Sequence, residues 1–127
     1  MTEPFANILI VDDDRQARLK LARILEGKGY HVSEVDGGRA ALETLAHEPF
    51  DLVLLDILMP EVDGIEVLKT LQADTRLSVI PVIVVSAVDD PQGIEKFKQL
   101  GARGYLTKPV DPDELVARVG ECLGGAR

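Results

Sequence analysis

Short, unbroken apolar runs alternate along the chain with longer stretches of helical periodicity. Three runs contain no polar position and are rich in β-branched residues: 8–11, 52–55 and 82–85. Runs of this kind are typical of strands buried on both faces of a parallel sheet. The segments 30–35 and 104–107 are more polar or shorter, so we expect them to form edge strands.

Five segments that follow these runs place apolar residues on one face of a helix. Their stripes are Ala17/Leu21/Ile24/Leu25, Ala41/Leu42/Leu45/Ala46, Ile65/Leu68/Leu71, Ile94/Phe97/Gly101 and Leu115/Val116/Val119/Leu123. Asp111-Pro112 is typical of a helix start before the last one. The alternation predicts an α/β fold, doubly wound (βα)₅ and flavodoxin-like. Its five-stranded parallel sheet has the order 2-1-3-4-5, in a single domain over 1–127.

Composition excludes several classes of protein. Apolar residues make up 46 % of 127 residues, too many for disorder and enough for one core. The formal charge of -8 argues against direct nucleic acid binding, which needs a basic surface, and against an anionic membrane surface. No apolar run approaches the ~18 residues of a membrane span, and the first residues lack a signal peptide pattern. With Cys122 as the one cysteine, no internal disulfide is available, and we expect a cytoplasmic location.

Polar residues follow four of the predicted strands. Asp12-Asp13-Asp14 comes after the first, Asp56 after the third, Ser86 after the fourth and Thr107-Lys108 after the fifth. In a sheet of order 2-1-3-4-5 the carboxyl ends of strands one and three border the crevice where ligands bind. We therefore expect Asp12, Asp13 and Asp56 to converge there, with Ser86 and Lys108 opposite.

These residue types fit phosphoryl transfer. Clustered carboxylates repel one another, and a hard cation such as Mg²⁺ removes that repulsion. Lys108 adds a mobile positive charge and Ser86 a hydroxyl donor, around a carboxylate nucleophile. Taken singly, each feature has a plainer explanation: the aspartate run as a helix cap, and Lys108-Pro109 as an exposed loop. Their joint placement at four strand ends favours a functional site.

The chain closely resembles the receiver domain of two-component response regulators over nearly its whole length. The matching stretches are ILIVDDD, DLVLLDILMPEVDG, PVIVVSA and GYLTKP. The resemblance implies that Asp56 is the phosphoacceptor. It implies Mg²⁺ bound by Asp13, Asp56 and the backbone carbonyl of Leu58, with Asp12 acting mainly through a metal-bound water. Lys108 would contact the phosphoryl group.

The resemblance also implies a switch. Ser86 would be the switch hydroxyl, with the small Ala87 beside it. Tyr105 would be the aromatic that turns inward, a role that the family resemblance favours over that of an ordinary edge-strand aromatic. The Lys108–Pro109 peptide is expected to be cis, and Gly64 to have a structural role.

Partners follow from the same resemblance. A sensor histidine kinase or histidine phosphotransfer protein would donate the phosphoryl group. An output domain or downstream protein would read the face formed by the fourth helix, fifth strand and fifth helix. The chain would not be an enzyme beyond its own phosphorylation and slow dephosphorylation. The resemblance also allows a homodimer that forms on activation. Related dimers usually carry an acidic pair where this chain has Arg103-Gly104, which weakens the expectation of the same symmetric dimer.

Three other readings remain open from the residues. An aspartate phosphatase would use Asp12 and Asp14, but the Thr or Val usual two residues further on is Gln16. A flavodoxin-like carrier would need a first loop rich in Ser and Thr. A degenerate receiver that only binds partners would have lost part of the acid, serine and lysine set.

We expect Asp14, where the family places no metal ligand, to cap a helix.

Overall fold

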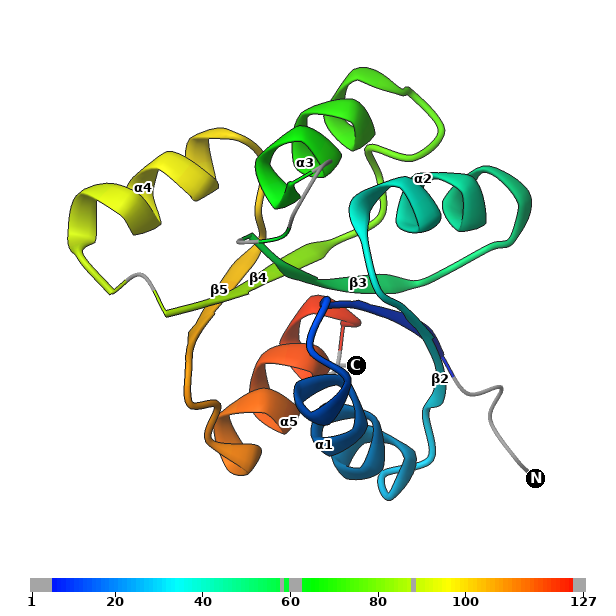
Figure 1. Cartoon of the computed structure of the whole chain (residues 1–127), viewed down its shortest axis with the longest axis vertical. Coiled ribbons are helices and arrows are strands. Elements are labelled where there is room, and N and C mark those ends of the chain that lie inside the picture. The colour runs from blue at the N-terminus through cyan, green and yellow to red at the C-terminus, as the bar shows by residue number, and fades with distance from the viewer. Residues whose placement is uncertain (1–5, 58, 60–62, 88, 125–127) are drawn as a thin grey trace.

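The computed structural model describes residues 6–57, 59, 63–87 and 89–124. Over these ranges strands and helices alternate strictly (Figure 1). In chain order they are β1 (Asn7–Val11), α1 (Arg15–Glu26), β2 (His31–Val35), α2 (Gly38–His47), β3 (Leu52–Asp56), α3 (Gly64–Ala73), β4 (Val82–Ser86), α4 (Pro91–Gln99), β5 (Gly104–Thr107) and α5 (Pro112–Cys122). No helix in the described part of the chain is both long and apolar enough to cross a membrane.

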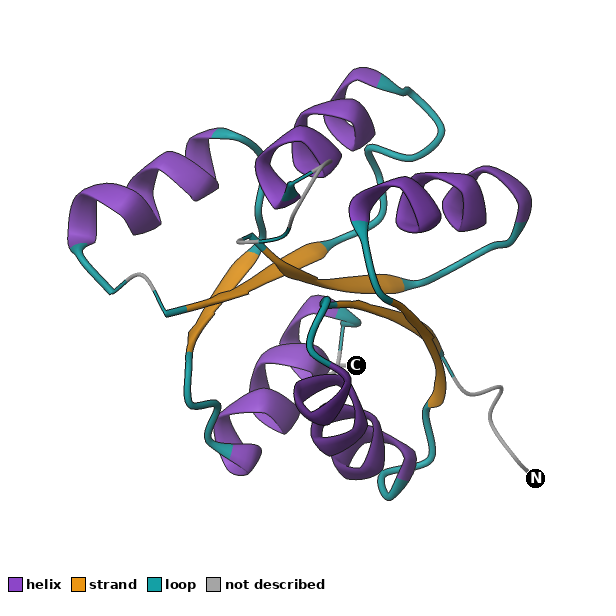
Figure 2. Ribbon diagram, in the orientation of Figure 1, coloured by secondary structure: helices purple, strands orange, loops and turns teal. Residues whose placement is uncertain are grey.

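The strands form one parallel sheet in the order β2-β1-β3-β4-β5, which confirms the predicted topology. Val11 lies opposite Leu55 and Ser86 lies opposite Thr107, so the strands end nearly level at their carboxyl edge. Helices α2, α3 and α4 cover one face of the sheet, and α1 and α5 cover the other (Figures 1 and 2). Because all five strands are parallel, the loops that follow them lie at the carboxyl edge of the sheet.

Two apolar cores lie on opposite faces of the sheet because side chains alternate along each strand. Leu9 and Val53 pack with α2, α3 and α4, whereas Ile8 and Leu52 pack with α1 and α5. All four are 0 % exposed. Burying a side chain of this size contributes about 1.5–3 kcal/mol. The central strands therefore form a rigid base for whatever their carboxyl ends carry.

Aspartates begin four of the helices. Asp14, Asp63, Asp90 and Asp111 occupy the N-cap positions and accept hydrogen bonds from first-turn amides. Such caps satisfy donors that the helix leaves unpaired. The expected cap at Asp14 and the expected helix start at Asp111-Pro112 are both confirmed.

Two predicted stripe positions are wrong. Ala46 lies in α2 but is exposed, because it is one residue further around the helix axis than Leu45, which faces the core. Gly101 lies beyond α4, after the C-cap Leu100, and its φ of 106° is the left-handed conformation that commonly ends helices. Conversely, Val67 of α3 is 0 % exposed although the predicted stripe omitted it.

Candidate functional site

The carboxylates of Asp12 and Asp56 lie side by side at the carboxyl edge of the sheet. Val11 pairs with Leu55 across β1 and β3, so the residues that follow this pair are neighbours. Asp56 is still within β3, one residue beyond the apolar run. The two aspartates are only 2 % and 5 % exposed. Burial of this kind is rare for carboxylates unless they have partners.

Asp13 completes an acidic cluster. One oxygen from each of Asp12, Asp13 and Asp56 can be chosen so that all lie within 4.8 Å of one another. Asp13 is exposed, so the cluster opens to solvent on one side. Three negative oxygens this close repel one another, and oxygen-only ligands suit a hard divalent cation such as Mg²⁺. The donor set therefore fits the predicted metal; the predicted carbonyl ligand, Leu58, lies outside the described residues.

Lys108 brings a positive charge to the two buried carboxylates. It follows β5, and its Nζ lies 3.0 Å from Asp12 Oδ2 and 3.6 Å from Asp56 Oδ1. Burial by itself lowers the pKa of Lys108, but the hydrogen bond with Asp12 and the charges of Asp56 and Asp12 outweigh it. The net pKa is raised, so the lysine is a cation at neutral pH. The predicted convergence of Asp12, Asp13, Asp56 and Lys108 is present.

Asp12 is held at four atoms. Its amide donates to the carbonyl of Val35 at 3.2 Å, and its Oδ1 accepts from the amide of Asp14 at 2.9 Å. Its Oδ2 accepts from Lys108, and its backbone carbonyl accepts from Arg18 Nη1 at 2.7 Å. Our sequence reasoning missed Arg18, since an arginine on a helix next to acidic residues gives no sign of which backbone oxygen it reaches.

Ser86 and Tyr105 lie close together beside the cluster. Ser86 ends β4 and is 0 % exposed. The Tyr105 ring stacks on Phe97 of α4, with centroids 5.7 Å apart and an interplanar angle of 14°. Burial raises the pKa of Tyr105, a hydrogen bond with the Ser86 side chain lowers it, and nearby Asp89 and Asp90 raise it; the net pKa is raised. The contact between Ser86, β5 and α4 could transmit a change, but the switch roles stay predictions.

Three supporting residues can be placed. The Lys108–Pro109 peptide bond is cis, as the resemblance implied. Gly64 is buried, and a Cβ there would lie 2.5 Å from the Asp56 carbonyl oxygen and 2.6 Å from the Ile57 Cα. Only glycine leaves room for that approach, which agrees with the structural role expected of Gly64. Ala87 follows Ser86 and is exposed.

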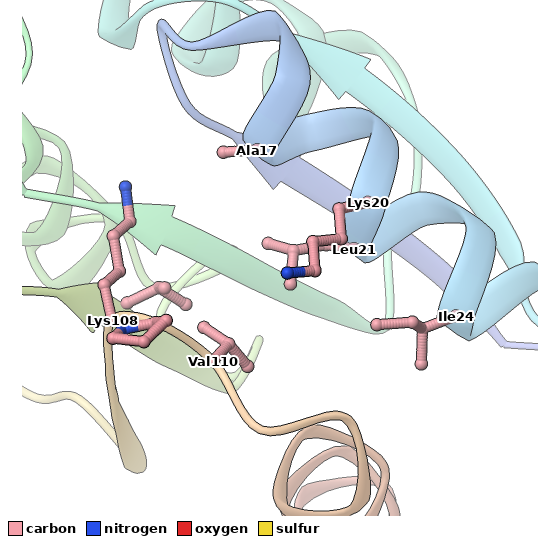
Figure 3. Close-up of a pocket in the computed structure, with 8 residues that line it drawn as sticks. Ala17, Lys20, Leu21, Ile24, Lys108 and Val110 are labelled. Atoms are coloured by element: carbon pink, nitrogen blue, oxygen red, sulfur yellow. The ribbon is translucent and has the colours of Figure 1, made fainter.

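An apolar hollow of about 150 Å³ lies beside Lys108, between α1 and the segment that leads into α5. Figure 3 shows Lys20, Leu21 and Ile24 of α1 projecting toward the segment that carries Lys108 and Val110. Ala17, Val85 and Pro109 complete its lining. The acidic cluster thus has an apolar surface as its neighbour on this side.

Asp14 takes no part in the acidic cluster. Its side chain accepts from the amide of Gln16 at 3.0 Å and caps α1. A phosphatase of the kind considered from the sequence would need Asp14 in the site together with Asp12. The geometry therefore disfavours that alternative, because Asp56 rather than Asp14 is the second buried carboxylate.

The order of the sheet and the acid–lysine site at its carboxyl edge are those expected of a receiver domain. A family model described as the response regulator receiver domain matches residues 8–120, so the chain belongs to that family. It is 38 % identical over 120 residues to Protein PilH of Pseudomonas aeruginosa, covering 94 % of this chain and 99 % of that protein. It is 39 % identical over 123 residues to the transcriptional regulatory protein ZraR of Escherichia coli, covering 97 % of this chain but 27 % of that protein.

Solved structures of other proteins share this fold. A putative response regulator from Chloroflexus aurantiacus superposes with a TM-score of 0.91 at 31 % identity, covering 95 % of this chain and 99 % of the other. The chemotaxis protein CheY4 of Vibrio cholerae gives a TM-score of 0.89 at 28 % identity, covering 94 % and 100 %. The predicted receiver fold is thereby confirmed.

Proposed function

We propose that this chain accepts a phosphoryl group on Asp56 and passes the resulting change in conformation to a partner protein. The observation that carries the proposal is the position of Asp56: it is 5 % exposed, clustered with two other carboxylates, and 3.6 Å from Lys108 Nζ. A buried carboxylate with both a cation-binding cluster and a lysine beside it suits attack on a phosphoryl group.

The phosphodonor is a phosphohistidine of a sensor histidine kinase or a histidine phosphotransfer protein. A carboxylate oxygen of Asp56 forms the new bond to phosphorus while the bond from phosphorus to the imidazole nitrogen breaks. The nitrogen keeps the electron pair and is protonated. Lys108 lies where it offsets negative charge on the phosphoryl oxygens. Mg²⁺ held by Asp12, Asp13 and Asp56 would supply further neutralisation of that charge.

The output is a population shift rather than catalysis on a separate substrate. Ser86 ends β4 beside this site, and it is hydrogen-bonded to Tyr105, whose ring stacks on α4. When the Ser86 hydroxyl moves to the phosphoryl oxygens, this hydrogen bond and stack rearrange. The phosphorylated state then favours one arrangement of α4, β5 and α5 over another.

The nature of the partner that reads this face is a separate question. Relatives occur both at nearly the same length as this chain, as with PilH, and as part of a longer protein, as with ZraR. An output domain or a separate downstream protein both fit the proposal. Direct binding of nucleic acid by this chain is disfavoured by its charge of -8.

The test is phosphorylation by acetyl phosphate with Mg²⁺, followed by intact-mass spectrometry. We expect the wild-type chain to gain one phosphoryl group, and Asp56→Asn to gain none. Asp51→Asn is the matched control, because Asp51 lies at the opposite end of β3, and an asparagine oxygen can still accept from the amide of Asn7. Chelation of Mg²⁺ should abolish the reaction. Phosphorylation of Asp56→Asn at the wild-type rate would refute the proposal.

A further inference from the structure

Arg18 joins three parts of the fold next to the acidic cluster. It lies on α1, and its side chain is 14 % exposed. Its Nη1 donates to the Asp12 carbonyl at 2.7 Å, and its Nε contacts Glu34 Oε1 of β2 at 3.3 Å. A guanidinium can do both at once because its donors form a rigid fork. Arg18 thus connects the turn after β1 to the neighbouring edge strand.

The contact with the Asp12 carbonyl matters because that oxygen belongs to the peptide unit that leads into Asp13. The atoms of a peptide unit lie close to one plane. On its other side, Asp12 is held by its amide, which donates to Val35 of β2. A charge-assisted hydrogen bond on the carbonyl therefore limits rotation of this unit. It also limits the direction in which the Asp13 side chain leaves the backbone.

We propose that Arg18 is a positioning residue, which fixes the Asp12–Asp13 peptide and thereby sets the cation affinity of the acidic cluster. The inference rests on the proposed function, since it assumes that the cluster of Asp12, Asp13 and Asp56 binds Mg²⁺. Arg18 acts through the backbone and does not contact the phosphoryl group. Outer partners that orient metal ligands commonly change metal affinity by about 10–100-fold when they are removed.

The sign of the effect separates positioning from simple charge. Arg18 is a cation near a cation site, so its removal on electrostatic grounds alone would tighten Mg²⁺ binding. If Arg18 instead orients the ligands, its removal weakens binding despite the lost repulsion. Arg18→Met keeps most of the aliphatic stem and loses both hydrogen bonds. Arg18→Lys keeps the charge, but a single ammonium group cannot reproduce the guanidinium geometry that contacts the Asp12 carbonyl and Glu34 together.

The experiment is calorimetric titration of each variant with Mg²⁺ alone, without a phosphodonor. We expect Arg18→Met to bind Mg²⁺ about tenfold more weakly than wild type, with Arg18→Lys intermediate. Arg23→Met is the matched control: it removes the same charge from an exposed position in the last turn of α1 and should leave the affinity unchanged. At saturating Mg²⁺, phosphorylation of Arg18→Met by acetyl phosphate should return toward the wild-type rate.

Amide hydrogen exchange gives a second readout that needs no metal. The amides of Asp12 and Asp14 should exchange faster in Arg18→Met, while the amides of Val53 and Leu54 in the central strand stay protected. Equal or tighter Mg²⁺ binding by Arg18→Met would overturn the inference, as would unchanged exchange at both aspartates. A wild-type chain that binds Mg²⁺ but is not phosphorylated would sink the proposed function and leave the role of Arg18 standing. A wild-type chain that binds no Mg²⁺ would overturn both.

Discussion

Gly64→Ala is the sharpest test of how the backbone supports Asp56. The added Cβ would lie 2.5 Å from the Asp56 carbonyl oxygen, roughly 0.9 Å inside the 3.4 Å at which ordinary van der Waals contact begins. It would also meet the Ile57 Cα at 2.6 Å. Both obstacles are backbone atoms, which cannot rotate away as a side chain does. Either the end of β3 or the start of α3 must move.

The size of the effect follows from two opposing terms. Overpacking of this kind costs typically about 1–3 kcal/mol and occasionally more. Alanine is favoured over glycine in a helix by about 0.5–1 kcal/mol. With two backbone clashes we expect the upper part of the overpacking range, and a net loss of about 2 kcal/mol. Unfolding entropy is about 2.1 cal/mol/K per residue, so about 270 cal/mol/K for 127 residues, and Tm should fall by about 7 °C.

Gly120→Ala is the matched control. Gly120 lies in α5, and a Cβ there would meet nothing within 4 Å. The same change should therefore raise the stability by about 0.5–1 kcal/mol and Tm by about 2–4 °C. Thermal unfolding followed by circular dichroism measures both variants.

The second readout is phosphorylation of Asp56 by acetyl phosphate. A displacement of about 1 Å at a reacting group can cost about 100-fold in rate, so Gly64→Ala should be slowed strongly while Gly120→Ala is not. If Gly64→Ala melts at or above the wild-type temperature, the close approach of α3 to the end of β3 does not constrain the chain, and the reasoning fails.

Two further predictions concern a cap and a titration. Asp111→Ala removes the acceptor for a first-turn amide of α5 and should cost about 1 kcal/mol, or about 4 °C in Tm, whereas Asp113→Ala in the same turn should cost a few tenths of that; thermal unfolding of the pair decides it. The raised pKa of Tyr105 predicts that its phenolate, followed by ultraviolet absorbance and removed in Tyr105→Phe, forms above pH 10.0. The pKa of Tyr105 is higher in the folded than in the unfolded chain. Its contribution to the free energy of unfolding is therefore fully present below the unfolded-state pKa and is lost as the pH rises through the folded-state pKa. A Tyr105 midpoint at or below 10.0 would contradict it.

Much of the fold was predictable because its signals are local. The runs 8–11, 52–55 and 82–85 are apolar at every position, and only strands covered on both faces tolerate that pattern. Parallel strands then need crossovers, and the helical stripes supply them. The rule that ligands bind beyond the carboxyl ends of the strands predicts from the sequence alone that Asp12, Asp56 and Lys108 lie together.

Element ends were less predictable. The predicted stripe includes Gly101, but the helix has already ended there. Glycine adopts a left-handed backbone conformation at little cost, and this conformation at Gly101 terminates α4. Ala46 fits the apolar stripe by type but is exposed, although Leu45 beside it in α2 is buried. Periodicity gives the direction of the apolar face, but it fixes neither the width of the buried stripe nor the residue at which the helix ends.

By itself, the sequence determined the alternation of strands and helices, the order of the sheet and the set of acidic, hydroxyl and lysine side chains at one edge. The tertiary structure alone decided which atoms meet: Arg18 with the Asp12 carbonyl, Lys108 with two carboxylates, and Gly64 against the backbone of Asp56. The physical reason is one of range. Hydrophobic patterning acts through spacing along the chain, whereas contacts of about 3 Å depend on how separate elements settle against one another.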